Sequence, residues 1–218
     1  MRRHDSTLTF DRPRRRMVED QLVARGITDA RVLDAMLHVP RHMFVDAALA
    51  SHAYQDSSLP IGEGQTISQP YMVAKMSQLL NLEGHERVLE IGTGCGYQTA
   101  VLSRLCRRVY SIERIPSLSE RARRNLRAAR HANVMLTCAD GTLGWKEYAP
   151  FDAVLAAAGG SEVPDAWIHQ LRDGGVLVMP LGSGSSHVLI RLRKRGAEII
   201  EERFDACTFV PLIAGRGA

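Results

Sequence analysis

From residue 87 onward, short apolar runs alternate with segments whose apolar residues recur every three to four positions. The runs predict buried strands at 87–91, 108–113, 133–138, 151–157 and 175–180, and the spaced segments predict helices at 97–106, 116–130 and 164–171. Two later segments, 187–193 and 198–209, alternate apolar and polar residues as antiparallel strands do. Strands and helices joined by short links predict an α/β fold, with a mostly parallel sheet covered by helices on both faces.

The first third of the chain has a helical pattern instead. Residues 14–25 predict a helix that ends at Gly26, and Asp29 is expected to cap a second helix that runs to Leu37. Proline and glycine among polar residues then predict a shaped loop over 52–66.

A further helix is expected to begin at Pro70, a residue that suits a first helical turn. The chain has no internal repeat and no low-complexity linker, so we expect one folded domain over 17–218. Within it, 17–80 would form a helical preface and a lid over the ligand, and 81–218 would form the ligand-binding sheet.

Charge is concentrated at the N-terminus. The formal net charge is +4, and the first sixteen residues hold six arginines and two aspartates, so the remaining chain is balanced. Residues 1–16 therefore predict a basic, disordered arm, while the neutral body argues against a nucleic-acid partner. The arm lacks the apolar segment of a secretory signal, and its aspartates disfavour a transit peptide. Met17 is an alternative start.

Four cysteines lie far apart, at positions 95, 106, 138 and 207. This spacing excludes a zinc ribbon and a dense disulfide framework, and it suits a reducing compartment. No run of about 18 apolar residues is present, so we expect no membrane-spanning helix. The pattern favours a monomer in the bacterial cytoplasm without a metal site.

The turn after the first predicted strand reads Glu90-Ile91-Gly92-Thr93-Gly94-Cys95-Gly96-Tyr97. Glycines at 92, 94 and 96 let the backbone bend sharply and approach a ligand closely. Tyr97 stands where the dinucleotide fingerprint needs its third glycine, and the chain has no phosphate-binding G-K-[ST] triplet. The charge of Glu90 would repel a pyrophosphate, so the turn favours a ligand that carries an amine or another cation.

Two more carboxylates follow the next predicted strands. Glu113 ends the second strand, where an acidic side chain can accept hydrogen bonds from both ribose hydroxyls. Asp140-Gly141 follows the third strand, in position to contact a base. Since the carboxyl ends of parallel strands meet at one edge, these groups predict a site for an adenosine with an amino-acid tail, which describes S-adenosyl-L-methionine (AdoMet).

With these residues in view, the sequence resembles the protein-L-isoaspartate O-methyltransferases, which repair damaged asparagine and aspartate residues. The resemblance runs from about Met17 to Leu212. The segments that carry it are Val39–Val45 (VPRHMFV), Leu59–Gly62 (LPIG), Gly64–Met72 (GQTISQPYM), the Glu90–Tyr97 turn and Phe209–Leu212 (FVPL). The Gln-Thr-Ile-Ser-Gln-Pro stretch is especially specific, because other methyltransferases do not carry it before the glycine turn.

The resemblance implies a Rossmann-like class I AdoMet-dependent methyltransferase fold, with a seven-stranded sheet, an N-terminal helical extension and C-terminal antiparallel strands. It implies transfer of a methyl group from AdoMet to the α-carboxylate of L-isoaspartyl residues in proteins and peptides, with D-aspartyl residues as a second candidate and S-adenosyl-L-homocysteine as the product. Ser68 would be the active-site residue. The cofactor-binding residues would be Thr66, Ile67, Ser68, Glu90, Gly92, Thr93, Gly94, Gly96, Glu113, Asp140 and Gly141, and the substrate-binding residues Ile61, Ser68, Val210 and Pro211.

One stretch departs from the family pattern. Where members usually have Ala-Pro or Pro-Pro after the fourth strand, this chain has Ala158-Gly159-Gly160-Ser161. Glycine in place of a stiffer residue costs about 0.4–1 kcal/mol in chain entropy. We therefore expect a looser loop and weaker binding of the peptide.

The chemistry suits these residue types. A carboxylate with a pKa of about 3.5–4 is ionised at pH 7, so its attack on a methyl group needs no general base. The site must instead orient the carboxylate and exclude water. A neutral hydroxyl such as Ser68 can orient the anion without over-stabilising it, and Phe209–Leu212 could clamp the peptide through backbone hydrogen bonds.

Other interpretations stay open. Ser68 could cap the helix at Pro70, and Cys95 could be a small filler. The same fold could methylate a nucleic acid or a metabolite, although Ala157–Ser161 lacks the Asn/Asp-Pro-Pro-aromatic turn of amino-methylating enzymes. A binding module without catalysis, whose arm engages an acidic partner, is the third possibility. His187 has no matched metal spacing and is expected to be an ordinary polar residue.

Overall fold

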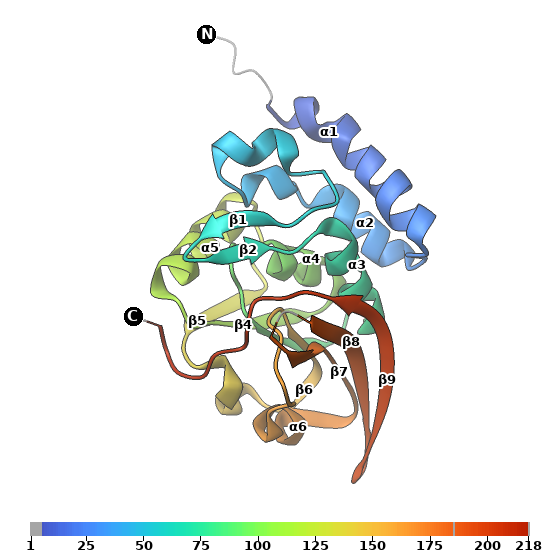
Figure 1. Cartoon of the computed structure of the whole chain (residues 1–218), viewed down its shortest axis with the longest axis vertical. Coiled ribbons are helices and arrows are strands. Elements are labelled where there is room, and N and C mark those ends of the chain that lie inside the picture. The colour runs from blue at the N-terminus through green and yellow to red at the C-terminus, as the bar shows by residue number, and fades with distance from the viewer. Residues whose placement is uncertain (1–5, 185, 218) are drawn as a thin grey trace.

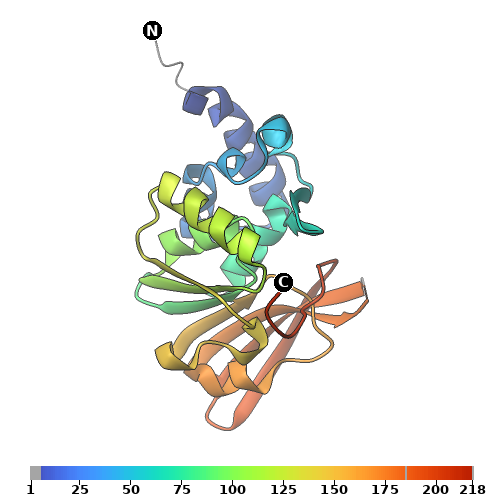
Figure 2. The same cartoon turned by 90° about the vertical axis from the view of Figure 1, so that its left-hand side faces the viewer.

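The computed structural model describes residues 6–184 and 186–217, which form a central sheet between two layers of helices (Figures 1 and 2). The seven strands lie in the order β5-β4-β3-β6-β7-β8-β9. Neighbours from β5 to β7 are parallel, and β8 and β9 pair antiparallel. The strands are β3 (Arg87–Ile91), β4 (Arg108–Glu113), β5 (Val134–Cys138), β6 (Phe151–Ala156), β7 (Leu171–Ser183), β8 (Ser186–Arg195) and β9 (Glu198–Cys207). The predicted fold class is confirmed.

Alternating side chains of the strands build a core on each face of the sheet. In β3, Val88 belongs to the larger core together with α3 (Pro70–Leu79), α4 (Tyr97–Leu105) and α5 (Pro116–Ala128). Its neighbour Leu89 belongs to the second core, under α6 (Asp165–Gln170) and around the fully buried Trp167. Both faces are therefore apolar, as a parallel sheet with crossover helices requires.

The N-terminal arm is the first correction. Residues 6–16 form helix α1 (Ser6–Arg16), so the expectation of a disordered arm is wrong for these residues, whereas 1–5 lie outside the described part of the chain. Phe10 explains the order: its ring stacks on the ring of His42 with centroids 4.1 Å apart. Arg14 also donates to Asp11 one turn earlier at 2.5 Å. The basic charge of the segment is as predicted, and the contact of Phe10 with His42 attaches the helix to the rest of the fold.

The helical preface otherwise follows its capping signals. The helix continues from α1 through a π-helical turn at Met17–Leu22 and ends at Gly26, whose φ of 84° allows the left-handed turn. Asp29 accepts hydrogen bonds from the amides of Arg31 and Val32 at the start of α2 (Ala30–His38). These confirm the predicted stop at Gly26 and the predicted cap at Asp29.

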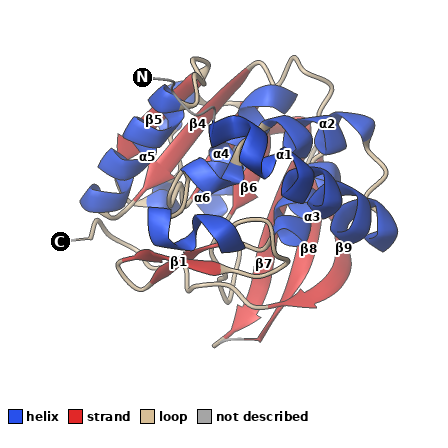
Figure 3. Cartoon of the chain, turned by 90° about the horizontal axis from the view of Figure 1, so that it is seen from above, coloured by secondary structure: helices blue, strands red, loops and turns tan. Residues whose placement is uncertain are grey.

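The segment predicted as a loop over 52–66 contains a small hairpin instead. Strands β1 (Leu59–Gly62) and β2 (Gln65–Ile67) pair antiparallel around Glu63 and Gly64, both with positive φ. Strands of three and four residues that contain proline and glycine leave no alternation to detect, which explains the wrong prediction. The hairpin leads into α3 (Figure 3). The predicted start of α3 at Pro70 is confirmed.

The larger core crosses the boundary between preface and sheet. Buried residues from Met17 to Leu82 pack in the same cluster as Val88, Val109 and Leu189. Among the described residues, no helix is both long and apolar enough to span a membrane.

Candidate active site

The carboxyl ends of the parallel strands open into a cavity, here named the first cavity. Its walls come from β2 and Ser68, the glycine turn after β3, the end of β4 and the C-terminal residues Val210–Ile213. A second cavity adjoins it, lined by Ser58, Gln69 and Met72 on one side and by Ala206–Val210 on the other. Four residues line both cavities: Thr66, Ser68, Ala157 and Val210.

The glycine turn has the conformation that its sequence predicts. Gly92 and Gly94, with φ of 88° and 56°, line the first cavity together with Thr93. Gly96 does not line it; a Cβ there would come within 3.2 Å of Leu126 on α5. This glycine serves the close packing of α4 on α5, and its contact with the cofactor stays a prediction.

Glu113 lies at the end of β4 with its carboxylate in the wall of the first cavity. The side chain is 4% exposed and accepts hydrogen bonds from the amides of Gly94 at 2.8 Å and Ile115 at 3.0 Å. An ionised carboxylate has about four lone-pair sites, so it can accept two more bonds. The predicted role toward two ribose hydroxyls fits this placement.

Glu90 is placed differently from its prediction. The side chain is fully buried on the face of β3 that α4 covers, and it does not line the first cavity. Its Oε2 atom accepts hydrogen bonds from the hydroxyls of Thr99 and Ser111, and Ser111 in turn contacts Thr93 of the glycine turn at 2.6 Å. Burial raises the pKa of Glu90 to about 7 against the opposing effect of these two hydroxyls. Glu90 therefore supports the glycine turn from beneath. The sequence held a signal for this, because Glu90 is two residues from the apolar Val88 and so points to the same face of β3.

Asp140 lies beside the first cavity and is not part of its lining, so its contact with a base stays a prediction. Gly141 lines the first cavity, whereas the carboxylate of Asp140 caps the short 3-10 turn that begins at Gly141, and it accepts from Thr142. Its other oxygen accepts from the amide of Gly215 at 2.7 Å. Burial alone would raise the pKa of Asp140. The hydrogen bonds from Thr142 and Gly215 outweigh burial and hold this pKa below its usual range. Asp140 thus fastens the C-terminal segment beside the cavity.

Ser68 does not cap the helix that follows it. The N-cap of α3 is Gln69, and no side chain bonds to the helix start there, so the capping interpretation is wrong. Ser68 instead lies in the wall between the two cavities, next to Thr66 and Ile67 of β2. Of the predicted substrate contacts, Val210 and Pro211 line the first cavity, whereas Ile61 lies outside both linings and is buried beside Gly94.

The loop after β6 makes backbone hydrogen bonds to two other segments. Gly159 donates to the carbonyl of Val210 and accepts from the amide of Leu212, while Gly160 donates to Pro180. Tertiary hydrogen bonds thus hold the two glycines in place, while the expected effect of this loop on peptide binding stays a prediction.

Sequence reasoning missed part of both linings. The first cavity extends beyond Glu113 to Arg114, Ile115 and Leu118. Their place directly after the end of β4 was a signal that could have found them. Cys207 and Thr208 line the second cavity, and no local motif marks them. Burial raises the pKa of the Cys95 thiol, which suits a filler and not a nucleophile.

The residues of the first cavity fit a nucleoside with an amino-acid tail. Glu113 offers oxygen acceptors for hydroxyls, and Ile115, Leu118 and Gly141 provide an apolar, open surface beside them. At Gly92, an added Cβ would lie 3.7 Å from the Cβ of Ala157, so a side chain there would narrow the space between the turn and the loop after β6. Carboxylate, bare backbone and apolar wall match the chemistry of AdoMet.

Known proteins are similar to this chain in sequence and in fold. The sequence profile of the family described as "Protein-L-isoaspartate(D-aspartate) O-methyltransferase (PCMT)" matches residues 13–217. The chain is 51% identical over 211 residues to the protein-L-isoaspartate O-methyltransferase of Geobacter metallireducens, covering 96% of this chain and 98% of that relative. It is 54% identical over 211 residues to protein-L-isoaspartate O-methyltransferase 2 of Geotalea uraniireducens, covering 96% and 97%.

Solved structures agree. A protein-L-isoaspartate O-methyltransferase superposes with a TM-score of 0.83 at 29% identity, covering 91% of this chain and 65% of that one. A Plasmodium falciparum protein described as a beta-aspartate methyltransferase (PCMT), in complex with S-adenosyl-L-homocysteine, superposes with a TM-score of 0.80 at 25% identity and covers 92% and 98%.

Proposed function

This chain belongs to the protein-L-isoaspartate(D-aspartate) O-methyltransferase family, and we propose on that premise that it methylates the α-carboxylate of L-isoaspartyl residues in damaged proteins, using AdoMet. D-aspartyl residues are a second candidate acceptor. The observation that carries the proposal is the position of Ser68 in the wall shared by the two cavities. A donor in the first cavity and a peptide in the second would meet at this residue.

When bound, AdoMet supplies a methyl group on a positively charged sulfur, for which the isoaspartyl carboxylate is the acceptor. Glu113 and the backbone of Gly92–Gly94 would hold the cofactor, the carboxylate by accepting hydroxyl hydrogen bonds and the turn by close approach. Glu90 stays beneath the turn and keeps Thr93 in place through Ser111. These residues position the donor and leave the chemistry to the acceptor.

Ser68 donates a hydrogen bond that orients the isoaspartyl carboxylate. The acceptor is already ionised at neutral pH, so the site needs no residue to remove a proton. Every side chain in the lining of the second cavity is uncharged, so nothing there neutralises the attacking oxygen. The β1–β2 hairpin and the segment Val210–Ile213 flank the first cavity and would limit the access of water.

The cysteines bear on the cellular compartment. Cys95, Cys106, Cys138 and Cys207 are free thiols, which suits a reducing compartment, and we propose action in the bacterial cytoplasm. Protein and peptide substrates follow from the family, whereas action as a monomer without a nucleic-acid partner stays a prediction.

A peptide pair tests the function. Purified protein is incubated with AdoMet labelled on its methyl group and with a peptide that contains either one isoaspartyl residue or a normal aspartyl residue at the same position. We expect base-labile label on the isoaspartyl peptide alone. Equal labelling of both peptides, label on RNA instead, or AdoMet binding without transfer would overturn the proposal.

A further inference from the structure

His187 is a buried residue beneath the loop after β6. It lies near the start of β8, paired with Gly182 of β7 on one side and with Cys207 of β9 on the other. The residue is 3% exposed, and within the described part of the chain its Nδ1 atom has no hydrogen-bond partner. A buried nitrogen without a partner lowers stability, so the imidazole is a costly way to fill this space.

The imidazole occupies the volume that a side chain at position 159 would need. A Cβ placed on Gly159 would lie 2.2 Å from Nε2 of His187 and 2.5 Å from its Cδ2. The backbone does not require glycine there, because Gly159 is not among the residues with positive φ. The ring of His187 is therefore what restricts position 159 to glycine.

Gly159 in turn holds the C-terminal segment between the cavities. Its N–H donates to the carbonyl of Val210 at 2.8 Å, and its carbonyl accepts from the amide of Leu212 at 2.7 Å, which makes a parallel bridge to Pro211. Val210 lines both cavities, and Leu212 lines the first. A continuous line of contacts thus connects His187, through Gly159, to the wall that faces the peptide.

We propose that His187 and Gly159 form a size-matched pair that sets the position of Val210–Leu212, and that His187 is a positioning residue for the isoaspartyl peptide. The inference rests on the proposed function for its substrate, but the pairing itself does not. It also explains how this chain manages without the proline of its family: the ring beneath the loop limits the loop's movement in place of a stiff backbone.

A double-mutant cycle tests the pair. Gly159→Ala adds one methyl group against the ring, and we expect KM for the isoaspartyl peptide to rise about tenfold. Kd for S-adenosyl-L-homocysteine should rise less than KM does, because Val210 and Leu212 form only part of the first cavity. His187→Ala alone should raise KM about threefold, since the loop loses its support. In the double variant KM should return to within about threefold of the wild type, because the space that the new methyl needs is free. Multiplicative effects, or an unchanged KM in Gly159→Ala, would overturn the inference.

Hydrogen exchange at the Leu212 amide gives a readout that does not depend on activity. Exchange should be faster in either single variant and slower again in the double variant, with the buried β3 amides unaffected. If Gly159→Ala fails to fold, His187→Ala decides alone: unchanged exchange at Leu212 would refute the pairing. If the wild type does not methylate the peptide but the exchange cycle holds, the proposed function fails and the pairing stands.

Discussion

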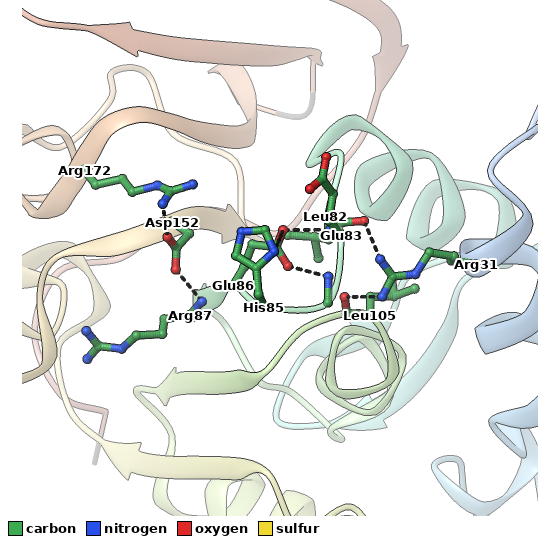
Figure 4. A network of polar contacts seen from close by, with 10 residues as sticks. Arg31, Leu82, Glu83, His85, Glu86, Arg87, Leu105, Asp152 and Arg172 are labelled. Atoms are coloured by element: carbon green, nitrogen blue, oxygen red, sulfur yellow. Dashed lines mark hydrogen bonds and ion pairs between the residues drawn. The ribbon is translucent and has the colours of Figure 1, made fainter.

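The two ends of the parallel strands are built in opposite ways. At the amino ends, side chains bind the backbone of neighbouring segments and close the edge (Figure 4). Glu86 accepts from the amides of Glu83 and Gly84 at 2.7 and 2.8 Å, and Arg31 donates to the carbonyls of Leu82 and Leu105. Asp152 accepts from the amide of Arg87 and pairs with Arg172.

At the carboxyl ends the backbone faces open space instead. The glycine turn, the end of β4 and the segment Val210–Ile213 line a cavity. Of the acidic groups at this end, Glu113 keeps acceptor capacity free, while Glu90 is buried below. One edge of the sheet therefore serves stability, and the other is kept available for ligands.

Two glutamates around β3 show the difference in their protonation. Burial alone would raise the pKa of Glu86, but the backbone amides of Glu83 and Gly84 outweigh it and the pKa is lowered. Glu90 has only two hydroxyl partners against complete burial, and its pKa rises to about 7. The ionised carboxylate of Glu86 thus stabilises the fold, whereas burial makes ionisation of Glu90 beneath the site unfavourable.

The largest effect is expected from Glu90→Gln. As the pH rises from about 4.5 to 7, Glu90 loses its proton in the unfolded chain but keeps it in the folded protein, so the free energy of unfolding falls. Above pH 7 Glu90 is ionised in both states, and the free energy of unfolding falls no further on its account. Removing the titration should raise the free energy of unfolding by about 3 kcal/mol at pH 8 and leave it nearly unchanged below pH 4.5. Urea unfolding across this pH range measures it; a destabilised variant at pH 8 would show that the anion is favoured.

Glu113→Ala should weaken the open end specifically. Loss of the ribose acceptor is expected to raise Kd for S-adenosyl-L-homocysteine about 100-fold, since hydrogen bonds to a charged group contribute roughly 1.5–3 kcal/mol each. Calorimetric titration of the variant gives the value. An affinity within threefold of the wild type would remove Glu113 from the cofactor site.

At the closed end, Glu86→Ala should reduce the free energy of unfolding by about 2 kcal/mol at pH 7, because two amides lose their acceptor. The loss should shrink as the pH falls through the lowered pKa of Glu86, the opposite sign to Glu90→Gln. Kd for S-adenosyl-L-homocysteine, measured on the folded variant, should not change. A large change in ligand affinity would contradict the division of the sheet into two ends.

Ser68→Ala should have the smallest effect on free energy and the most local one. We expect kcat/KM for an isoaspartyl peptide to fall about tenfold, equivalent to about 1.4 kcal/mol, with the midpoint of thermal unfolding unchanged. Ser51→Ala, the same change at an exposed position of the 3-10 helix Ala47–His52, is the matched control. Turnover equal to that of the control would remove Ser68 from the mechanism.

Most elements followed from the sequence because their signals are local. The strands from 87 to 156 and the capped starts at Asp29 and Pro70 rest on alternation, on a side-chain cap and on a fixed φ. The predictions for the segments of helix α1 and the β1–β2 hairpin were wrong for two different reasons. Helix α1 packs through Phe10 on His42, which is distant in the chain, whereas the two hairpin strands are too short to show alternation.

The chain by itself thus determined the sheet, the glycine turn, the acidic strand ends and the family. Tertiary structure decided what each acidic group faces: Glu113 the cavity, Glu90 the hydroxyls of Thr99 and Ser111, and Asp140 the amide of Gly215. The physical reason is that residue type and periodicity act over a few positions, whereas burial and hydrogen-bond partners depend on segments that meet only after folding. For the same reason it is the ring of His187, and not the backbone conformation, that leaves no room for a side chain at position 159.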